Sequence, residues 1–153
     1  MKIRLIRDED YAECARMHRQ TIRNVNSKDY AEDVIRLWSG RNTVKKMRTG
    51  APNVKRWVAV ENNKIIGYCD HHLLKSELLG LYVHKDYMGR GIGSRLLKTA
   101  EASLKKRGCK KIEIEATITA KPFYMKHGYK VVKKTFHKFQ NTKARVFIMT
   151  KNI

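Results

Sequence analysis

The stretch "YVHKDYMGRGIGSRLL", residues 82–97, joins an aromatic and β-branched run to a run of leucines through three glycines at alternate positions. A glycine-rich turn from a strand into a helix aims several backbone N–H groups, and the positive end of the helix dipole, at one point. Glycine leaves that backbone open to a ligand because it has no Cβ, and Arg90 and Arg95 add positive charge. The stretch predicts a phosphate-binding turn at the start of a helix.

The residues on either side predict the unit in which this turn sits. "ELLGLYV" (77–83) has the composition of a strand, residues 91–108 carry apolar side chains at helical spacing, and "KKIEIEAT" (110–117) alternates like a second strand. A strand, a long helix and a strand form a right-handed βαβ unit, so the two strands should be parallel. Gly80, inside the first strand, indicates a bulge or a close backbone approach.

The rest of the chain predicts antiparallel strands and helices around that unit. Asn62 and Asn63 form a turn pair that tolerates positive φ, which predicts a hairpin, and a second hairpin should turn at Asn141. A helix is expected after Ser27 as its N-cap, and residues 39–53 read as a loop with one helical turn. The prediction is one α+β domain over residues 1–153: a mixed, mostly antiparallel sheet of about seven strands with a central parallel βαβ junction and helices on both faces.

The chain is strongly basic, with 34 Lys and Arg against 14 Asp and Glu and a net charge of +20. Such a field attracts polyanions, but the basic residues are scattered, which favours a solvated surface over a dedicated nucleic-acid site.

No apolar run reaches the roughly 18 residues of a membrane span, and the N-terminus lacks the apolar centre of a signal peptide. The three cysteines read as reduced thiols. We therefore expect a cytoplasmic protein without a membrane partner. His71 and His72 are neighbours in a strand and point to opposite faces, so no metal site is predicted.

Of two familiar phosphate-binding patterns, the P-loop fails against residues 82–97, and the dinucleotide fingerprint stays a weak alternative, with Glu113 or Glu115 as its ribose-binding acid. A P-loop needs Gly-Lys-Ser/Thr, which is absent. The dinucleotide fingerprint G-x-G-x-x-G needs a third glycine where Ser94 or Leu96 stands.

A third pattern matches. Met88 to Gly93, "MGRGIG", resembles motif A of the GNAT superfamily of acetyl-CoA-dependent N-acetyltransferases, Gln/Arg-x-x-Gly-x-Gly/Ala, with Met in the place of Gln/Arg. "AKPFYMKHGYK" (120–130) is similar to the family's motif B, and "TIRNVNSKDY" with Trp38 looks like the N-terminal helices of small members. The resemblance covers nearly the whole chain, and the two motifs occur in the family's order.

The resemblance implies acetyl transfer from acetyl-CoA, as cosubstrate, to a primary amine by direct attack in a ternary complex. It implies that Leu81 supplies the oxyanion-stabilising N–H and that Tyr124 protonates the leaving thiolate; a phenol near pKa 10 is protonated at pH 7. It also implies that the coenzyme lies along the first strand of the βαβ unit and in the turn. The cofactor-binding residues expected on this basis are Leu81, Tyr82, Val83, Met88, Gly89, Arg90, Gly91, Ile92, Gly93, Ser94 and Tyr124.

The acceptor amine is an ammonium ion at neutral pH, so the reaction needs a base or a water path to one. Glu77, four residues before Leu81, is the predicted base, since members with a glutamate base carry theirs there, and Glu61 is its substitute.

Two other functions are alternatives to acetyl transfer: an acyl-CoA-binding sensor without turnover, and a basic nucleic-acid-binding module in which Phe136 and Phe139 stack on bases. The acceptor is not identified, but the basic surface favours one that carries negative charge or is bound to RNA. Many relatives form homodimers, so the resemblance allows one here.

Overall fold

The computed structural model describes residues 1–153, apart from the side chain of Ala51. Its strands and α-helices follow in the order β1 (Lys2–Leu5), α1 (Tyr11–Asn24), α2 (Glu32–Ser39), α3 (Val44–Thr49), β2 (Val54–Glu61), β3 (Lys64–His72), β4 (Glu77–Val83), α4 (Ile92–Lys106), β5 (Lys111–Thr117), α5 (Lys121–Lys126), β6 (Lys130–Phe139) and β7 (Thr142–Asn152). Single 3₁₀ turns cover Asp8–Asp10, Asn26–Lys28, Ala51–Asn53 and Lys85–Tyr87.

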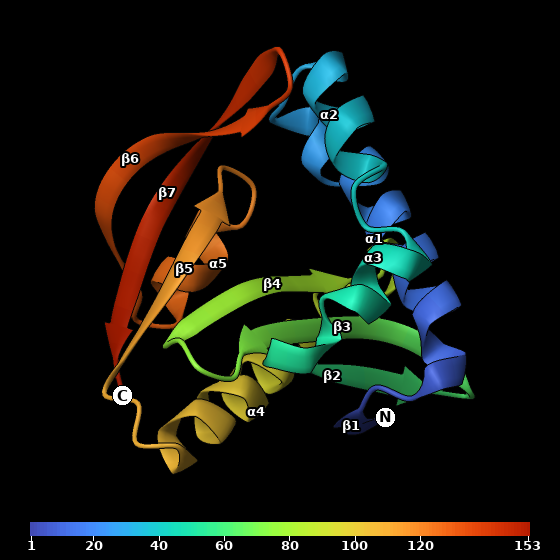
Figure 1. The fold of residues 1–153 in the computed structure, drawn as a ribbon, viewed down its shortest axis with the longest axis vertical. Helices are drawn as coiled ribbons and strands as arrows, with labels where there is room; N and C mark the ends of the chain where they lie inside the picture. Colours follow the sequence, from blue (N-terminus) through green and yellow to red (C-terminus); the bar gives the residue numbers. More distant parts are fainter.

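All seven strands belong to one sheet, in the order β1-β2-β3-β4-β5-β7-β6 (Figure 1). The β4–β5 pair is parallel and every other pair is antiparallel. Helix α4 connects the two parallel strands. The predicted α+β class, with a central parallel βαβ junction in a mixed sheet, is confirmed.

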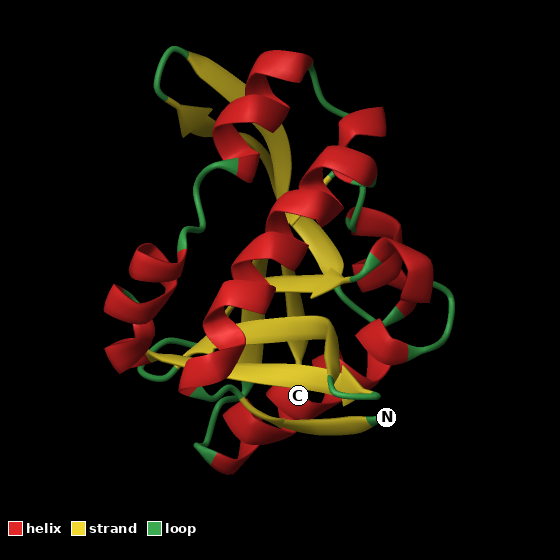
Figure 2. Ribbon diagram, turned by 90° about the vertical axis from the view of Figure 1, so that its right-hand side faces the viewer, coloured by secondary structure: helices red, strands yellow, loops and turns green.

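Helices cover both faces of the sheet, as predicted. Leu96, Leu97 and Ala100 of α4 pack with Leu78 of β4 and Ile114 of β5 in the larger core cluster. On the other face, α1 and α3 pack against β2 and β3 in a second cluster. Figure 2 shows α1 lying across the strands on that side. None of the helices in the described residues is long and apolar enough to cross a membrane.

The two hairpin turns are confirmed. Asn62 and Asn63 have φ of 48° and 60°, and Gln140, next to Asn141, has φ of 44°. The predicted cap at Ser27 is wrong: the chain makes a 3₁₀ turn over Asn26–Lys28, and α2 begins at Glu32.

Contacts with distant parts of the chain explain why the helix starts late. The Asp29 carboxylate accepts a hydrogen bond from Thr119 (2.7 Å), and the Tyr30 hydroxyl donates to the carbonyl of Arg145 (2.6 Å). These contacts hold Asp29 and Tyr30 outside helical geometry, so no helix forms directly after Ser27. Residues 39–53 contain more helix than predicted, since α3 occupies six of them.

A bulge and a divergence of strands shape the middle of the sheet. Asp70 pairs with Gly80 but His71 pairs with Leu78, so Leu79 is an extra residue in β4. The parallel register between β4 and β5 ends at Leu78↔Ile114. Beyond that point the two strands separate, which leaves their backbone edges open to a ligand.

Candidate active site

A cavity of about 770 Å³ lies where β4 and β5 separate. β4, the turn before α4, β5 and α5 line one part of it, and α1, the segment around α2 and the β6–β7 hairpin line the rest. In Figure 1 the tip of this hairpin lies next to α2, and Val34, Phe139 and Ala144 form a small core cluster there. The cavity therefore lies between the open strand edges and a roof made by α2 and the hairpin.

The glycine-rich turn forms one end of the cavity. Gly89 and Gly91 have φ of +77° and +74°, in the left-handed region that favours glycine, and Gly91 is the N-cap of α4. A Cβ added at either glycine would have no heavy atom within 4 Å, so the space in front of the backbone is open. The first N–H groups of an α-helix lack partners within the helix. The turn therefore presents free donors and the positive helix end to a ligand.

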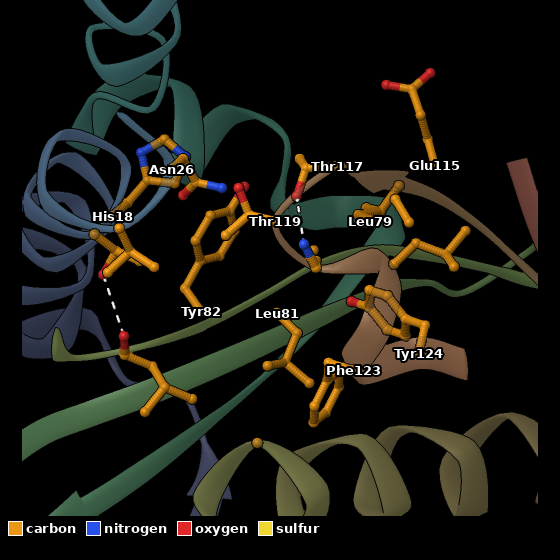
Figure 3. Close-up of a pocket in the computed structure, with 18 of the residues that line it drawn as sticks. His18, Asn26, Leu79, Leu81, Tyr82, Glu115, Thr117, Thr119, Phe123 and Tyr124 are labelled. Atoms are coloured by element: carbon orange, nitrogen blue, oxygen red, sulfur yellow. Dashed lines mark hydrogen bonds between the residues drawn. The ribbon is translucent and has the colours of Figure 1, made fainter. Parts of the chain in front are cut away.

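Tyr124 of α5 faces the cavity from the side of β5. The residue is only 2% exposed, and Figure 3 shows its hydroxyl directed into the cavity, above Phe123. Burial raises the pKa of Tyr124 well above its usual value near 10. The hydroxyl is therefore protonated at neutral pH and can donate a proton only to a base formed during a reaction.

His127 ties α5 to the first turn of α4. Its Nδ1 lies 2.8 Å from the carbonyl of Phe123, and its Nε2 lies 2.8 Å from the hydroxyl of Ser94. A carbonyl only accepts, so Nδ1 donates to Phe123, while Nε2 shares a hydrogen bond with the Ser94 hydroxyl. This bridge fixes Tyr124 relative to the glycine-rich turn.

The wall opposite β5 is built from α1 and β4. Thr21 donates to the carbonyl of Val83 (3.3 Å), and the His18 ring packs edge-on against Tyr82 with centroids 4.7 Å apart. His18 is 1% exposed, and its Nδ1 has no partner. Burial, together with the nearby charges of Arg56 and Arg19, lowers the pKa of His18 from 6.5 to about 4. His18 is therefore neutral in the folded protein at pH 7.

We expect His18 to make the fold less stable as the pH falls. Below pH 6.5 the unfolded chain protonates this ring, whereas the folded protein does so only near pH 4. The free energy of unfolding should therefore drop by about 3 kcal/mol between pH 7 and pH 4 through this group. Urea denaturation of wild type and His18→Gln at both pH values measures the effect, because the variant keeps all other titrations. If the free energy of unfolding changed equally with pH in the two proteins, the lowered pKa of His18 would be contradicted.

The structure brings ten of the eleven expected cofactor-binding residues to the cavity wall. The exception is Arg90, whose guanidinium lies over the Tyr87 ring at 4.8 Å. Leu81 lies in the centre of the cavity floor in Figure 3. Among the side chains that the structure describes, no three His, Cys, Asp or Glu are placed to hold a metal ion.

Neither predicted carboxylate base lines the cavity. Glu77 pairs with Glu113 where β4 and β5 are still hydrogen-bonded, so it lies before the point at which the strands separate. Glu61 ends β2 at the turn of the first hairpin, 3.9 Å from the amino group of Met1. The structure therefore brings Leu81 and Tyr124 together, but not with Glu77 or Glu61.

Sequence reasoning missed a polar chain on the roof side of the cavity. The Glu115 carboxylate accepts a hydrogen bond of 2.7 Å from Nδ1 of His137, and the guanidinium of Arg41 donates to Nε2 of the same ring. All three residues line the cavity. The alternation of β5 indicates that Glu115 faces away from buried Ile114, but nothing local in the sequence joins Glu115 to His137 or Arg41.

Comparisons with known proteins agree with this geometry. The model of the acetyltransferase (GNAT) domain family matches residues 26–141. An uncharacterized N-acetyltransferase of Escherichia coli, YafP, is 24% identical over 133 residues, which cover 87% of this chain and 83% of that protein.

Two solved structures share the fold over nearly their whole length. A GCN5-related N-acetyltransferase from Rhodopseudomonas palustris superposes with a TM-score of 0.93 at 23% identity, covering 99% of this chain and 95% of the other. The PaiA N-acetyltransferase of Thermoplasma acidophilum, in complex with coenzyme A, superposes with a TM-score of 0.80 at 23% identity over 100% of both chains. The chain therefore belongs to the GNAT acetyltransferase family and is an N-acetyltransferase.

Proposed function

We propose that the protein transfers the acetyl group of acetyl-CoA directly to a primary amine of a bound acceptor. The observation that carries this proposal is the continuity of one cavity from the open N–H groups at the start of α4 to the hydroxyl of Tyr124. The neutral amine attacks the thioester carbonyl and forms the C–N bond, the nitrogen then releases a proton to solvent, the C–S bond breaks, and Tyr124 gives its proton to the thiolate and regains one from solvent. The N–H of Leu81 stabilises the oxyanion.

The coenzyme fits the turn and the diverging strands. The diphosphate of acetyl-CoA would accept hydrogen bonds from the turn between Met88 and Ser94, where the helix dipole also favours negative charge. The pantetheine arm would lie along the open edge of β4 from Val83 to Leu81. The coenzyme A complex of the Thermoplasma acidophilum relative supports the same ligand class for this cavity.

Glu115 is better placed than Glu77 to receive the proton that the acceptor ammonium must lose. It is the only carboxylate among the described lining residues, and it lies one residue beyond Ile114, where the parallel pairing ends. Its side chain is 41% exposed, so a water can connect it to the amine and to bulk solvent. We assign the proton acceptor role to Glu115, acting directly or through that water.

Replacing Gly91 with Val should raise the dissociation constant of acetyl-CoA about 10- to 100-fold, because the side chain fills the space needed by the diphosphate and its charge-assisted hydrogen bonds are lost. Gly108→Val is a matched control. Gly108 also has a positive φ (+84°) and open space around its Cβ, but it lies after α4, away from the cavity. Isothermal titration calorimetry measures the acetyl-CoA affinity of both variants. An equal loss of affinity in the two would contradict the proposed diphosphate site in the turn before α4.

The proposed reaction is tested by release of free CoA in the presence of a panel of primary amines. Saturable CoA release that requires an amine supports transfer. Acetyl-CoA binding without release under any amine would instead identify the acyl-CoA-binding sensor. No binding at all would overturn the coenzyme assignment.

A second candidate function, binding of a nucleic acid, has one specific observation in its favour. Phe136 is 45% exposed on the outer face of the β6–β7 hairpin, with the cations of Lys143 and Arg145 at 4.5 and 5.3 Å from its ring centre. Polyanion binding there should weaken steeply with added salt. Homodimer formation, a cytoplasmic location and the absence of a metal stay predictions.

A further inference from the structure

We propose that the acceptor carries a carboxylate in the same small molecule as the reacting amine, and that Arg41 binds this carboxylate. The inference rests on the proposed function, since it concerns the acceptor half of the same cavity. It starts from the polar chain of Arg41, His137 and Glu115.

Arg41 is a cation without a carboxylate partner. Among the side chains that the structure describes, no Asp or Glu oxygen lies within salt-bridge distance of its guanidinium, whereas Arg4, Arg48 and Arg56 each have an aspartate partner. Its one hydrogen bond runs from Nη1 to His137. A guanidinium has five N–H donors, so four remain for a ligand. The planar arrangement of these donors matches a carboxylate.

The guanidinium is held in place before any ligand binds. It lies over the ring of Phe139 at 5.3 Å from the centroid, in addition to its bond to His137. Phe139 itself packs near Trp38 of α2, with centroids 6.5 Å apart. These two contacts reduce the side-chain freedom that Arg41 would lose on binding, which favours recognition by this residue.

The tautomer of His137 determines which groups donate and which accept between Arg41, His137 and Glu115. An arginine only donates, so Nε2 of His137 accepts and Nδ1 carries the proton that goes to Glu115. The imidazole ring of His137, with one hydrogen bond on each side, thus separates the Arg41 guanidinium from the Glu115 carboxylate. An acceptor whose amine approaches Glu115 can place an acidic group near Arg41 when a short spacer joins the two groups, as in an amino acid.

The charge of the cavity disfavours the opposite class of acceptor. The charged residues of the described lining are Arg41, Lys126 and Glu115, and the whole chain carries +20. A polyamine would meet net repulsion as it enters. An amino acid brings a negative group toward Arg41 and only one positive group toward Glu115.

The experiment compares acceptors that differ only at the acidic end. The probes are β-alanine and 4-aminobutyrate, each paired with its carboxamide, with CoA release as the readout. For wild type we expect kcat/KM to favour each acid over its amide by at least about 10-fold, the usual size of a hydrogen-bonded charge contact. In Arg41→Gln the acids should lose about 10- to 100-fold and the amides should change less than about threefold, so the preference disappears.

Two variants separate recognition from general effects. Arg41→Lys keeps the charge without the planar donors and should recover only part of the preference. Arg36→Gln removes an exposed arginine of α2 that does not line the cavity, and it should keep the wild-type preference.

The possible failures are distinguishable. Turnover with equal kcat/KM for acids and amides would overturn this inference and leave acetyl transfer intact. Better use of 3-aminopropylphosphonate than of 4-aminobutyrate would overturn the carboxylate assignment in favour of a phosphate-like group. No CoA release with any amine, charged or neutral, would overturn the proposed function itself.

Discussion

Tyr124→Phe is expected to lower kcat by roughly two to four orders of magnitude, the range of general acid catalysis by one side chain. The variant removes the only hydroxyl that α5 directs into the cavity, while the ring and its contacts with Phe123 and Tyr129 remain. Acetyl-CoA affinity should change little, because the diphosphate and the pantetheine arm bind elsewhere. Steady-state kinetics with calorimetric titration of acetyl-CoA separates the two effects.

Tyr129→Phe is the matched control for this prediction. Tyr129 is equally buried (2% exposed), and burial, with the charge of Glu101, raises its pKa too. Its hydroxyl donates to Glu101 at 3.0 Å and does not line the cavity. Its loss should therefore reduce stability without a comparable loss of turnover. If the two variants lowered kcat alike, Tyr124 would be a packing residue and the proton would come from another group.

The parts of the fold that follow from local sequence could be predicted. Glycine at positive φ, asparagine in tight turns and apolar side chains at helical spacing are local features, and they located the turn before α4, both hairpin turns and α4 itself. The start of α2 could not be predicted in this way. It depends on a hydrogen bond that Asp29 accepts from Thr119 and on one that Tyr30 donates to Arg145, residues that lie 90 and 115 positions away along the chain.

The candidate site divides in the same manner. The residues proposed to bind the coenzyme come from one continuous segment and from α5, so sequence motifs could point to them, and ten of the eleven line the cavity. The acceptor half joins Arg41, Glu115 and His137 from three distant segments, and no spacing rule connects them. The prediction of Glu77 as base rests on its place four residues before Leu81, where family members with a glutamate base carry theirs. In the structure Glu77 lies where β4 and β5 are still paired, before the strands separate after Leu78, and it does not line the cavity.

Asp70→Ala is expected to lower the free energy of unfolding by about 3–5 kcal/mol, the usual cost of leaving one charge of a buried ion pair without its partner. Asp70 and Arg56 are 6% and 8% exposed, on β3 and β2, and their side chains form a hydrogen-bonded ion pair. A domain of this size is usually stable by only 5–15 kcal/mol. The change should therefore appear as a large shift of the urea midpoint.

The position of Asp70 connects this pair to the active site. Its register partner is Gly80, next to the extra residue Leu79 of β4, and both Leu79 and Gly80 line the cavity. Asp86→Ala is the control: Asp86 pairs with Lys85 at 2.7 Å but its side chain is 61% exposed, so its loss should leave the urea midpoint nearly unchanged. The double variant Asp70→Leu with Arg56→Met removes both charges and should recover most of the stability lost in Asp70→Ala. A double variant as unstable as the single one would show that the hydrogen bonds of the pair, and not the unpaired charge of Arg56, hold these strands together.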